Sequence, residues 1–313
     1  APRDTLDAGC FHCLPMDLPL SAAPPAPTAA ALAEPYAVLM PPRQTAPLVF
    51  ASPHSGRAYP TEFLADSRLD ALTLRRSEDS FVEELFASAP LAGCPLIHAI
   101  FPRAWCDVNR EPWELDPAMF DAPLPEFVNA ASPRVGAGLG MIARVVATGE
   151  TIYRRKLTFA EAEARVAAHW RPYHAALAAL IAATVRRFGC CLLIDCHSMP
   201  AQSPTLGRMR PADVVLGDAH GTSCAGLATR RIEEGLARIG LTVRRNEPYA
   251  GGYITRHYGR PREGVHAVQI ELARGLYMDE ARIERGPGFA RLRHDLAGLI
   301  EGLARADWAA LCP

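Results

Sequence analysis

Apolar and polar positions follow two kinds of pattern from residue 47 onward. Short apolar runs with the length and composition of buried strands lie at 48–51, 95–101, 191–194, 213–216 and 265–272. Longer stretches with a helical spacing of apolar residues lie at 80–88, 158–188, 223–239 and 288–306. Strands that alternate with helices of this length predict an α/β fold with a mixed, largely parallel sheet flanked by helices.

The longest predicted helix, over 158–188, carries a proline in its interior. Its apolar positions include Val166, Trp170 and Leu177, and the stretch is rich in alanine. Pro172 lacks a backbone N–H and is therefore expected to kink or divide this helix. Gly189 is a C-terminal cap candidate, because glycine readily adopts the left-handed conformation found there.

The first 45 residues show neither pattern. They are rich in alanine and proline, and they lack the basic segment followed by a continuous apolar segment that marks a secretory signal. We expect an irregular, flexible tail over 1–45. A chain of 313 residues is long enough for two domains, but we interpret 46–313 as a single domain.

Composition excludes some classes of function. Hydrophobic residues make up 49% and charged residues 21% of the chain, as in ordinary globular proteins. No apolar run approaches the roughly 18 residues of a membrane span, so an integral membrane protein is excluded. The net charge of -1 argues against a protein built mainly to bind nucleic acid.

The positive charge is almost entirely arginine, because Lys156 is the only lysine. The planar guanidinium group binds carboxylates through two parallel hydrogen bonds, which an ammonium group cannot do. Compositional bias of the coding genome is the favoured explanation, but the composition also suits a small anionic substrate as the partner. The sequence does not indicate an oligomeric state.

The nine cysteines favour reduced thiols in a cytoplasmic protein. Cys190, Cys191 and Cys196 lie in an apolar run typical of a buried strand, where free cysteine is a common core residue. A zinc site formed by Cys10, His12 and Cys13 in the tail is a weaker interpretation, because no second Cys-x-x-Cys pair lies at zinc-finger spacing.

Two histidines occupy equivalent places in the predicted sheet. His54 and His197 each follow an apolar strand, and each is adjacent to a serine. Neutral imidazoles joined by a carboxylate form common metal sites, and ligands gather where parallel strands end. The alternative is that each histidine is a hydrogen-bonded structural residue, because no compact His-Glu-x-x-His spacing is present.

The carboxylates nearest to a predicted helix start are Glu78 and Asp79. Asp79 is placed to accept backbone N–H groups as a helix cap, or to act as a metal ligand. The residues alone leave the two interpretations open.

Glu271 lies inside the apolar run 265–272. On an alternating strand it points to the same side as Gln269. A glutamate in such a strand is costly unless it is paired or functional. It is therefore either half of a buried ion pair, for example with Arg274, or a general base next to a metal-activated water.

A polar segment follows the apolar run 95–101. Its Arg103, Asn109 and Arg110 combine guanidinium and amide donors suited to a substrate carboxylate. The alternative is that the arginines form ion pairs with Asp107 or Glu111.

The segment 246–252 combines asparagine, proline and two glycines, which favour a tight turn. Tyr249 places an aromatic hydroxyl there. By itself the motif predicts only a turn.

Taken in order, these segments resemble the N-formylglutamate amidohydrolases. The resemblance spans roughly 48–280, and six motifs in one order are far more specific than any single motif. They are His54 in Ser-Pro-His-Ser-Gly, Asp79 in Ser-Glu-Asp, Arg103 with Asp107-Val108-Asn109-Arg110, Asp195-Cys196-His197-Ser198, Asn246-Glu247-Pro248-Tyr249 with Gly251-Gly252, and Gln269-Ile270-Glu271 with Leu276-Tyr277-Met278-Asp279.

The resemblance implies a single zinc-peptidase-like domain related to the carboxypeptidases. It implies hydrolysis of N-formyl-L-glutamate to formate and L-glutamate, a step of histidine breakdown. One Zn²⁺ per chain is expected, with His54, Asp79 and His197 as ligands and Glu271 as general base. The residues expected to bind substrate are Arg103, Asn109, Arg110, Tyr249 and Arg274.

Two alternatives remain at this point. The chain is a zinc carboxypeptidase or deacylase for another N-acyl or peptide substrate, because a fold does not fix a substrate. Or it is a metal-free binding protein, in which His54, Asp79 and His197 would not converge.

Overall fold

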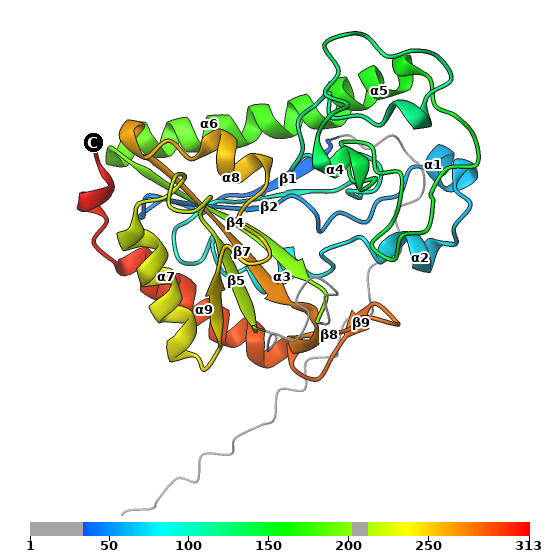
Figure 1. The fold of residues 1–313 in the computed structure, drawn as a ribbon. Helices are drawn as coiled ribbons and strands as arrows, with labels where there is room; N and C mark the ends of the chain where they lie inside the picture. The colour runs from blue at the N-terminus through cyan, green and yellow to red at the C-terminus, as the bar shows by residue number, and fades with distance from the viewer. Residues whose placement is uncertain (1–33, 202–211) are drawn as a thin grey trace, which may run out of the picture.

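The computed structural model describes residues 34–201 and 212–313, and a seven-stranded sheet forms its centre (Figure 1). The strand order is β1-β3-β2-β4-β7-β5-β6. The strands are β1 (Tyr36–Leu39), β2 (Leu48–Ser52), β3 (Leu96–Ala99), β4 (Cys191–Met199), β5 (Val214–Gly217), β6 (Val243–Arg245) and β7 (Val265–Ala273). The pairs β1–β3 and β7–β5 are antiparallel, and the other neighbouring pairs are parallel. The predicted mixed, largely parallel sheet is confirmed.

Helices cover both faces of this sheet (Figure 1). They are α1 (Thr61–Asp66), α2 (Ala71–Arg75), α3 (Val82–Leu85), α4 (Pro133–Gly136), α5 (Phe159–Arg165), α6 (Arg171–Phe188), α7 (Gly226–Arg238), α8 (Tyr253–Tyr258) and α9 (Phe289–Arg305). Short 3-10 turns lie at Pro117–Met119, Pro261–Glu263, Arg274–Leu276 and Ala309–Leu311. The ribbon of β8 (Met278–Asp279) and β9 (Glu284–Arg285) stands apart from the main sheet. Among the described residues, no helix has the length and apolarity needed to cross a bilayer.

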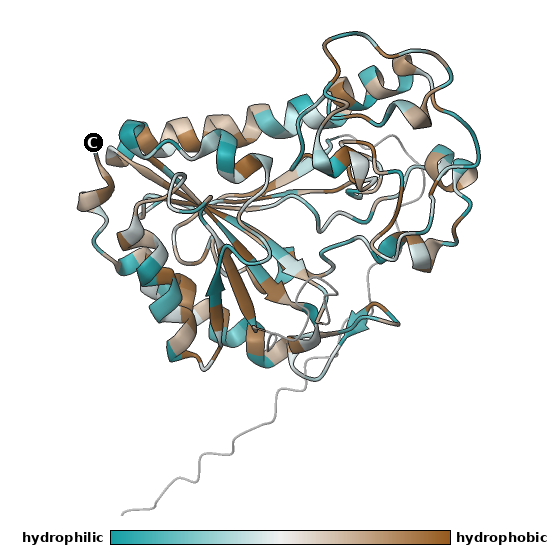
Figure 2. Ribbon diagram, in the orientation of Figure 1, coloured by the Kyte–Doolittle hydropathy of each residue, from teal (hydrophilic) through white to brown (hydrophobic). Residues whose placement is uncertain are grey.

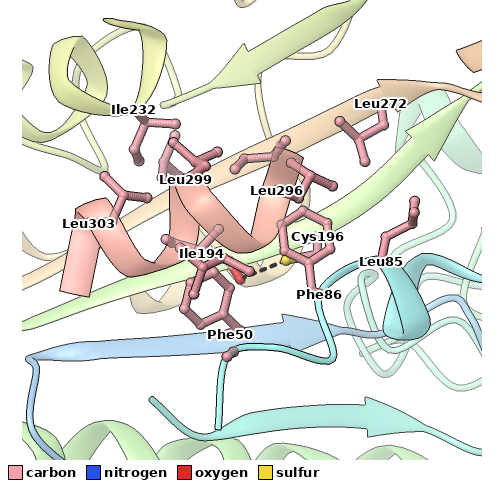
Figure 3. Close-up of a cluster of buried hydrophobic side chains, with 14 of the residues drawn as sticks. Phe50, Leu85, Phe86, Ile194, Cys196, Ile232, Leu272, Leu296, Leu299 and Leu303 are labelled. Carbon is pink, nitrogen blue, oxygen red and sulfur yellow. Dashed lines mark hydrogen bonds between the residues drawn. The ribbon is translucent and has the colours of Figure 1, made fainter. Parts of the chain in front are cut away.

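The alternation of side chains along each central strand divides the core into two layers. In β4, Leu192, Ile194 and Cys196 pack with α3, α7 and α9 (Figure 3). Cys191 and Leu193 face the opposite layer, toward α6 and the segments that precede it. The central strands are accordingly mostly apolar along their length (Figure 2). Burial of one such aliphatic side chain contributes about 1.5–3 kcal/mol.

The long helical stretch is divided, as Pro172 predicted. Thr158 caps α5 in a reciprocal capping box with Glu161. A π-helical turn, Val166–Trp170, lies between α5 and α6, and Pro172 follows directly after it. Proline and π turns are both common causes of an irregularity within a long helix. Gly189 ends α6 with a φ of 81°, the left-handed cap that the sequence indicated.

Two predicted boundaries were wrong. The helix expected over 80–88 is reduced to α3, because Phe81 adopts a left-handed φ of 68° immediately before it. The strand expected to end at residue 194 continues to Met199, so His197 lies within β4 rather than in a loop after it.

Part of the segment 1–45, expected to be an irregular tail, is a strand. Residues 36–39 form β1, which pairs with β3 at the edge of the sheet. Residues 1–33, including Cys10, His12 and Cys13 of the weaker zinc interpretation, lie outside the described residues. The described cysteines, among them Cys190, Cys191 and Cys196, are free thiols.

A candidate metal centre at the strand ends

The alternation that builds the two core layers also builds the site. In β4 the apolar residues Cys191 and Leu193 are followed on the same face by Asp195 and His197. The neighbouring parallel strand β7 places Gln269 beside Asp195 and Glu271 beside His197. One face of the sheet therefore changes from apolar to polar at the carboxyl ends of its parallel strands, where α/β proteins place their ligands.

His54, Asp79 and His197 converge at this edge. The candidate ligand atoms all lie within 4.8 Å of one another, and all three residues are buried. Oδ2 of Asp79 lies 3.0 Å from Nδ1 of His197 and 3.4 Å from Nδ1 of His54. A metal-free binding protein would not be expected to bring these three side chains together, and the structure does bring them together.

Each histidine is oriented by a second carboxylate on the far side of its ring. Nε2 of His54 lies 2.7 Å from Oδ1 of Asp107, and Nε2 of His197 lies 3.0 Å from Oδ2 of Asp195. A carboxylate that accepts one ring N–H directs the other ring nitrogen toward a metal. Nδ1 of His54 is buried and has no hydrogen-bond partner among the described residues, so the residues fit a cation held by two Nδ1 atoms and Oδ2 of Asp79.

The electrostatics of the cluster favour a positive charge at its centre. Burial alone would lower the pKa of His197, but the carboxylates of Asp195 and Asp79 raise it well above its ordinary value. Burial likewise acts to raise the pKa of Asp79, but hydrogen bonds and charge from the two histidines lower it well below its usual range. Ionised carboxylates thus surround a position suited to a cation.

Asp79, and not Glu78, faces the histidines. The backbone N–H of Asp79 donates to the carbonyl of His54, which ties the two segments together. The Glu78 carboxylate turns away and accepts hydrogen bonds from Tyr59, Arg75 and Ser80. Asp79 is not a helix cap either, because the N-cap residue of α3 is Phe81 and that cap has no side-chain hydrogen bond.

Arg274 lies against Asp79 rather than against Glu271. Its Nη2 donates to Oδ1 of Asp79 at 3.1 Å, and its Nε donates to Oγ of Ser198 at 3.1 Å. Arg274 is buried, and its charge adds to that of the histidines in balancing the Asp79 carboxylate. The ion pair between Arg274 and Glu271 considered from sequence is not formed.

Glu271 is instead held by an amide. Nε2 of Gln269 donates to Oε1 of Glu271 at 2.6 Å, as expected for residues on the same face of a strand. Burial raises the pKa of Glu271 to about 7, and His197 and Arg103 act in the opposite direction. A carboxyl that titrates near neutrality can accept and return a proton.

The side chain of Asn109 links His197 on β4 to the start of α8. Its Nδ2 lies 3.2 Å from Nε2 of His197, and its Oδ1 accepts the backbone N–H of Ile254 at 2.8 Å. The side chain fits only because residue 252 is glycine, since a Cβ there would lie 2.3 Å from Oδ1 of Asn109. The buried amide of Asn109 therefore positions its neighbours through contacts within the protein.

A Gly252→Ala substitution is expected to destabilise the fold by about 1–3 kcal/mol, the typical cost of overpacking a filled core position. The added methyl group would displace Asn109 and with it the ring of His197. Chemical denaturation measures the free energy of unfolding. Gly298→Ala is the matched control, because nothing lies within 4 Å of its added Cβ and alanine favours the α9 helix. Equal stability of the two variants would contradict the prediction.

Arg103 and Arg110 have different surroundings. Nη2 of Arg103 donates to Oδ2 of Asp107 at 2.7 Å, the ion pair weighed from sequence, and its side chain is 22% exposed. Arg110 is buried and donates to the backbone carbonyls of Leu139 and Asn109 rather than to a carboxylate of the described residues. Burial lowers the pKa of Arg110 to about 10. An anion beside Arg110 would relieve the cost of this buried charge.

Tyr249 lies in the loop before α8, half-buried beside an apolar cluster of Met199, Val215 and Ala273. The preceding Asn246 has a left-handed φ of 62°, which agrees with the predicted turn.

Sequence reasoning missed the residues that support the ligands. Asp107 and Asp195 orient the two histidines. One signal was available for Asp195: it lies two residues before His197 and so shares its strand face, the same relation by which the sequence placed Gln269 beside Glu271. The pairing of His54 with Asp107 joins residues 53 positions apart and has no such local signal.

The chain is similar to known proteins along most of its length. The sequence model of the N-formylglutamate amidohydrolase family matches residues 46–278. An N-formylglutamate deformylase of Pseudomonas aeruginosa is 33% identical over 241 residues, covering 76% of this chain and 84% of that protein. One from Pseudomonas putida is 29% identical over 237 residues, covering 75% of this chain and 82% of its own length.

Solved structures are similar in fold. The crystal structure of N-formylglutamate amidohydrolase from Ralstonia eutropha JMP134 superposes with a TM-score of 0.80 at 38% identity, covering 86% of this chain and 97% of that one. A gene product of Agrobacterium tumefaciens, with a TM-score of 0.60 and 20% identity, covers 87% of this chain and 94% of that one and shares the fold.

Proposed function

The chain belongs to the N-formylglutamate amidohydrolase family, and from that premise we propose that it hydrolyses N-formyl-L-glutamate to formate and L-glutamate with one Zn²⁺ per chain. It is a hydrolase of a linear amide C–N bond. The observation that carries the proposal is the convergence of His54, Asp79 and His197 beside a carboxyl, Glu271, whose pKa lies near neutrality. We assign this machinery to one catalytic domain over 46–313, to which β1 adds an edge strand.

The ligand set suits zinc. Two imidazole nitrogens and one carboxylate oxygen are a common catalytic zinc set, and three protein ligands leave a position open. Bound there, the ion would polarise the formyl carbonyl and lower the pKa of a water molecule. Asp107 and Asp195 fix the ring orientation of His54 and His197, and Arg274 balances the charge of Asp79.

Glu271 is assigned as the general base and then the general acid. As a carboxylate it removes a proton from the attacking water, and as a carboxylic acid it gives that proton to the departing amine nitrogen. Burial raises the pKa of Glu271 to about 7, so its carboxylate is a stronger base toward the attacking water than an ordinary glutamate. Gln269 holds Oε1, which leaves Oε2 as the oxygen that exchanges the proton.

Arg110 and Arg103 are assigned to the substrate's negative charge. Arg110 combines burial with the absence of a carboxylate partner among the described residues, as expected of a cation that awaits an anionic ligand. Arg103 is fixed by Asp107 and is partly exposed beside the metal ligands. Asn109, Tyr249 and Arg274 remain in the proposed substrate-binding set, although Asn109 and Arg274 contact the protein itself.

Arg110→Gln is expected to raise the KM for N-formyl-L-glutamate by about 10- to 100-fold, with a smaller change in kcat. A hydrogen bond to a charged group contributes about 1.5–3 kcal/mol, which is a factor of that size. Steady-state kinetics separate the two constants. Arg293→Gln, an exposed position on α9, removes the same charge and should leave both constants unchanged. A normal KM in Arg110→Gln would remove Arg110 from the substrate site.

The test of the whole proposal is formate release from N-formyl-L-glutamate by purified protein, with and without added Zn²⁺. Zinc-dependent release supports both substrate and metal. N-acetyl-L-glutamate and a short peptide serve as competing substrates, because a deacylase or carboxypeptidase would prefer one of them. Stoichiometric metal without formate release would retain the metal centre and reject the substrate.

A further inference from the structure

A cationic cavity lies where the segment 66–68 meets the segment 152–154. Its volume is about 290 Å³, and none of the residues that line it is acidic. Its lining includes no residue of the proposed metal centre or of the proposed substrate-binding set. Five cationic side chains contribute to its wall: Arg68, Arg144, Arg154, Arg155 and Lys156.

The backbone holds two of these arginines in a fixed arrangement. Ser67 and Tyr153 form an antiparallel bridge. The backbone N–H of Arg68 donates to the carbonyl of Ile152 at 2.7 Å, and that of Arg154 donates to Asp66 at 2.9 Å. The two arginines are thus anchored at opposite ends of one short ladder.

The side chain of each arginine also bonds to the backbone of the opposite segment. Nε of Arg68 donates to the carbonyl of Tyr153 at 2.8 Å, and Nε of Arg154 donates to the carbonyl of Ser67 at 2.6 Å. Each guanidinium is therefore oriented through Nε, which leaves its terminal Nη groups for another partner. No carboxylate of the described residues pairs with either one. Holding the fork in place beforehand reduces the entropy lost when a ligand binds.

The other cations of the cavity divide into two kinds. Arg155 is neutralised by Asp66 and Glu161, each at 2.6 Å, and Arg144 is neutralised by Asp116 at 2.8 Å. Lys156 donates only to the backbone carbonyl of Ala118. Three positive charges, on Arg68, Arg154 and Lys156, therefore meet at one cavity without a carboxylate of the described chain to balance them.

We propose that this cavity binds the phosphate group of a small molecule, at a site separate from the amidohydrolase centre. A phosphate carries about 1.5–2 negative charges near pH 7 and three strong acceptor oxygens. These match two guanidinium forks and one ammonium group better than a single carboxylate would. The volume of about 290 Å³ suits a phosphate with a small organic substituent.

The test is a calorimetric titration with inorganic phosphate at constant ionic strength. The Arg68→Gln/Arg154→Gln double variant is expected to bind phosphate at least about 100-fold more weakly, because each arginine loses a charged hydrogen bond worth about tenfold or more in affinity. Arg293→Gln and Arg110→Gln should bind as the wild type does. The second of these excludes phosphate bound at the substrate site. Lys156→Gln, an exposed position, gives an independent variant if the double variant unfolds.

The single lysine offers a second measurement. Acylation of Lys156 by an N-hydroxysuccinimide ester, followed by peptide mass spectrometry, should slow in the presence of phosphate in the wild type but not in the double variant. Glycerol phosphate that binds more tightly than orthophosphate would indicate a phosphorylated metabolite, whereas the reverse order would indicate free phosphate. Glutarate bound as tightly as phosphate, binding only of polynucleotides, or equal affinity in wild type and double variant would each overturn the proposal.

Discussion

A Glu271→Gln variant is expected to lose about 10²–10⁴-fold in kcat for formate release, the range that a general acid–base group contributes. The amide has nearly the shape of the carboxyl but cannot take a proton from water or return it to the leaving nitrogen. The fold and the metal content should persist, because Glu271 is not one of the three converging ligands and Oε1 can still accept from Gln269. Stopped assays of formate, together with zinc analysis of the same sample, measure both quantities.

The dependence of kcat/KM on pH is a second test of Glu271 as the general base. Burial raises the pKa of Glu271 to about 7, so its carboxylate, the form that acts as base, is lost as the pH falls through that value. The wild-type kcat/KM should therefore decline toward low pH. A bound dication would favour the carboxylate and place the decline at or below pH 7. Whatever activity remains in Glu271→Gln should lack this decline.

Glu83 provides a matched control. Burial raises the pKa of this glutamate, on α3, to about 7 as well, although it is not among the converging ligands. Glu83→Gln should keep most of the wild-type activity and the same acidic decline. If Glu271→Gln retained more than about a tenth of the wild-type kcat, or if the decline followed Glu83, Glu271 would not be the base.

The convergence of three residues could be predicted because strand ends and motif order mark them. His54 and His197 were placed at strand ends from the apolar runs before them, and Asp79 was chosen over Glu78 through the family resemblance. The structure brings the same three residues together. Fold class was predictable for a related reason, because the buried strands of a parallel sheet read as continuous apolar runs.

The supporting contacts could not be predicted, because they join distant segments. Arg274 and Asp79 are 195 residues apart, and the sequence offered Glu271 as a nearer partner for that arginine. The end of β4 was misjudged for a different reason. Asp195 and His197 are polar residues inside a strand, and an apolar-run criterion stops at the first of them.

A different carboxylate orients each of the two histidines. Asp107, which accepts from Arg103, contacts His54, and Asp195 contacts His197. Asn109 links the two supports, because its backbone N–H donates to Asp107 and its side chain lies beside His197. These contacts do not pass through the ring of His54, so removal of that ring should leave the rest of the site assembled. Loss of metal can therefore be separated from loss of fold.

A His54→Ala variant is accordingly expected to bind Zn²⁺ more than about 100-fold less tightly than the wild type and to lose formate release. Removal of residues that only support a ligand already costs about 10- to 100-fold in affinity, and removal of the ligand itself should cost more. The fold should survive, because Asp107 keeps its ion pair with Arg103. Competition with a chromophoric chelator measures the affinity, and thermal unfolding reports the fold.

Asp107→Asn and His294→Ala complete this experiment. An amide at residue 107 can still contact Nε2 of His54 but carries no charge, so zinc affinity should fall by about 10- to 100-fold, between wild type and His54→Ala. His294 is exposed on α9, and its replacement should change neither affinity nor activity. Two results would show that the histidine–aspartate cluster is structural: full activity of the wild type after exhaustive chelation, or full zinc affinity in His54→Ala. The hydrolysis would then need a different source of carbonyl polarisation.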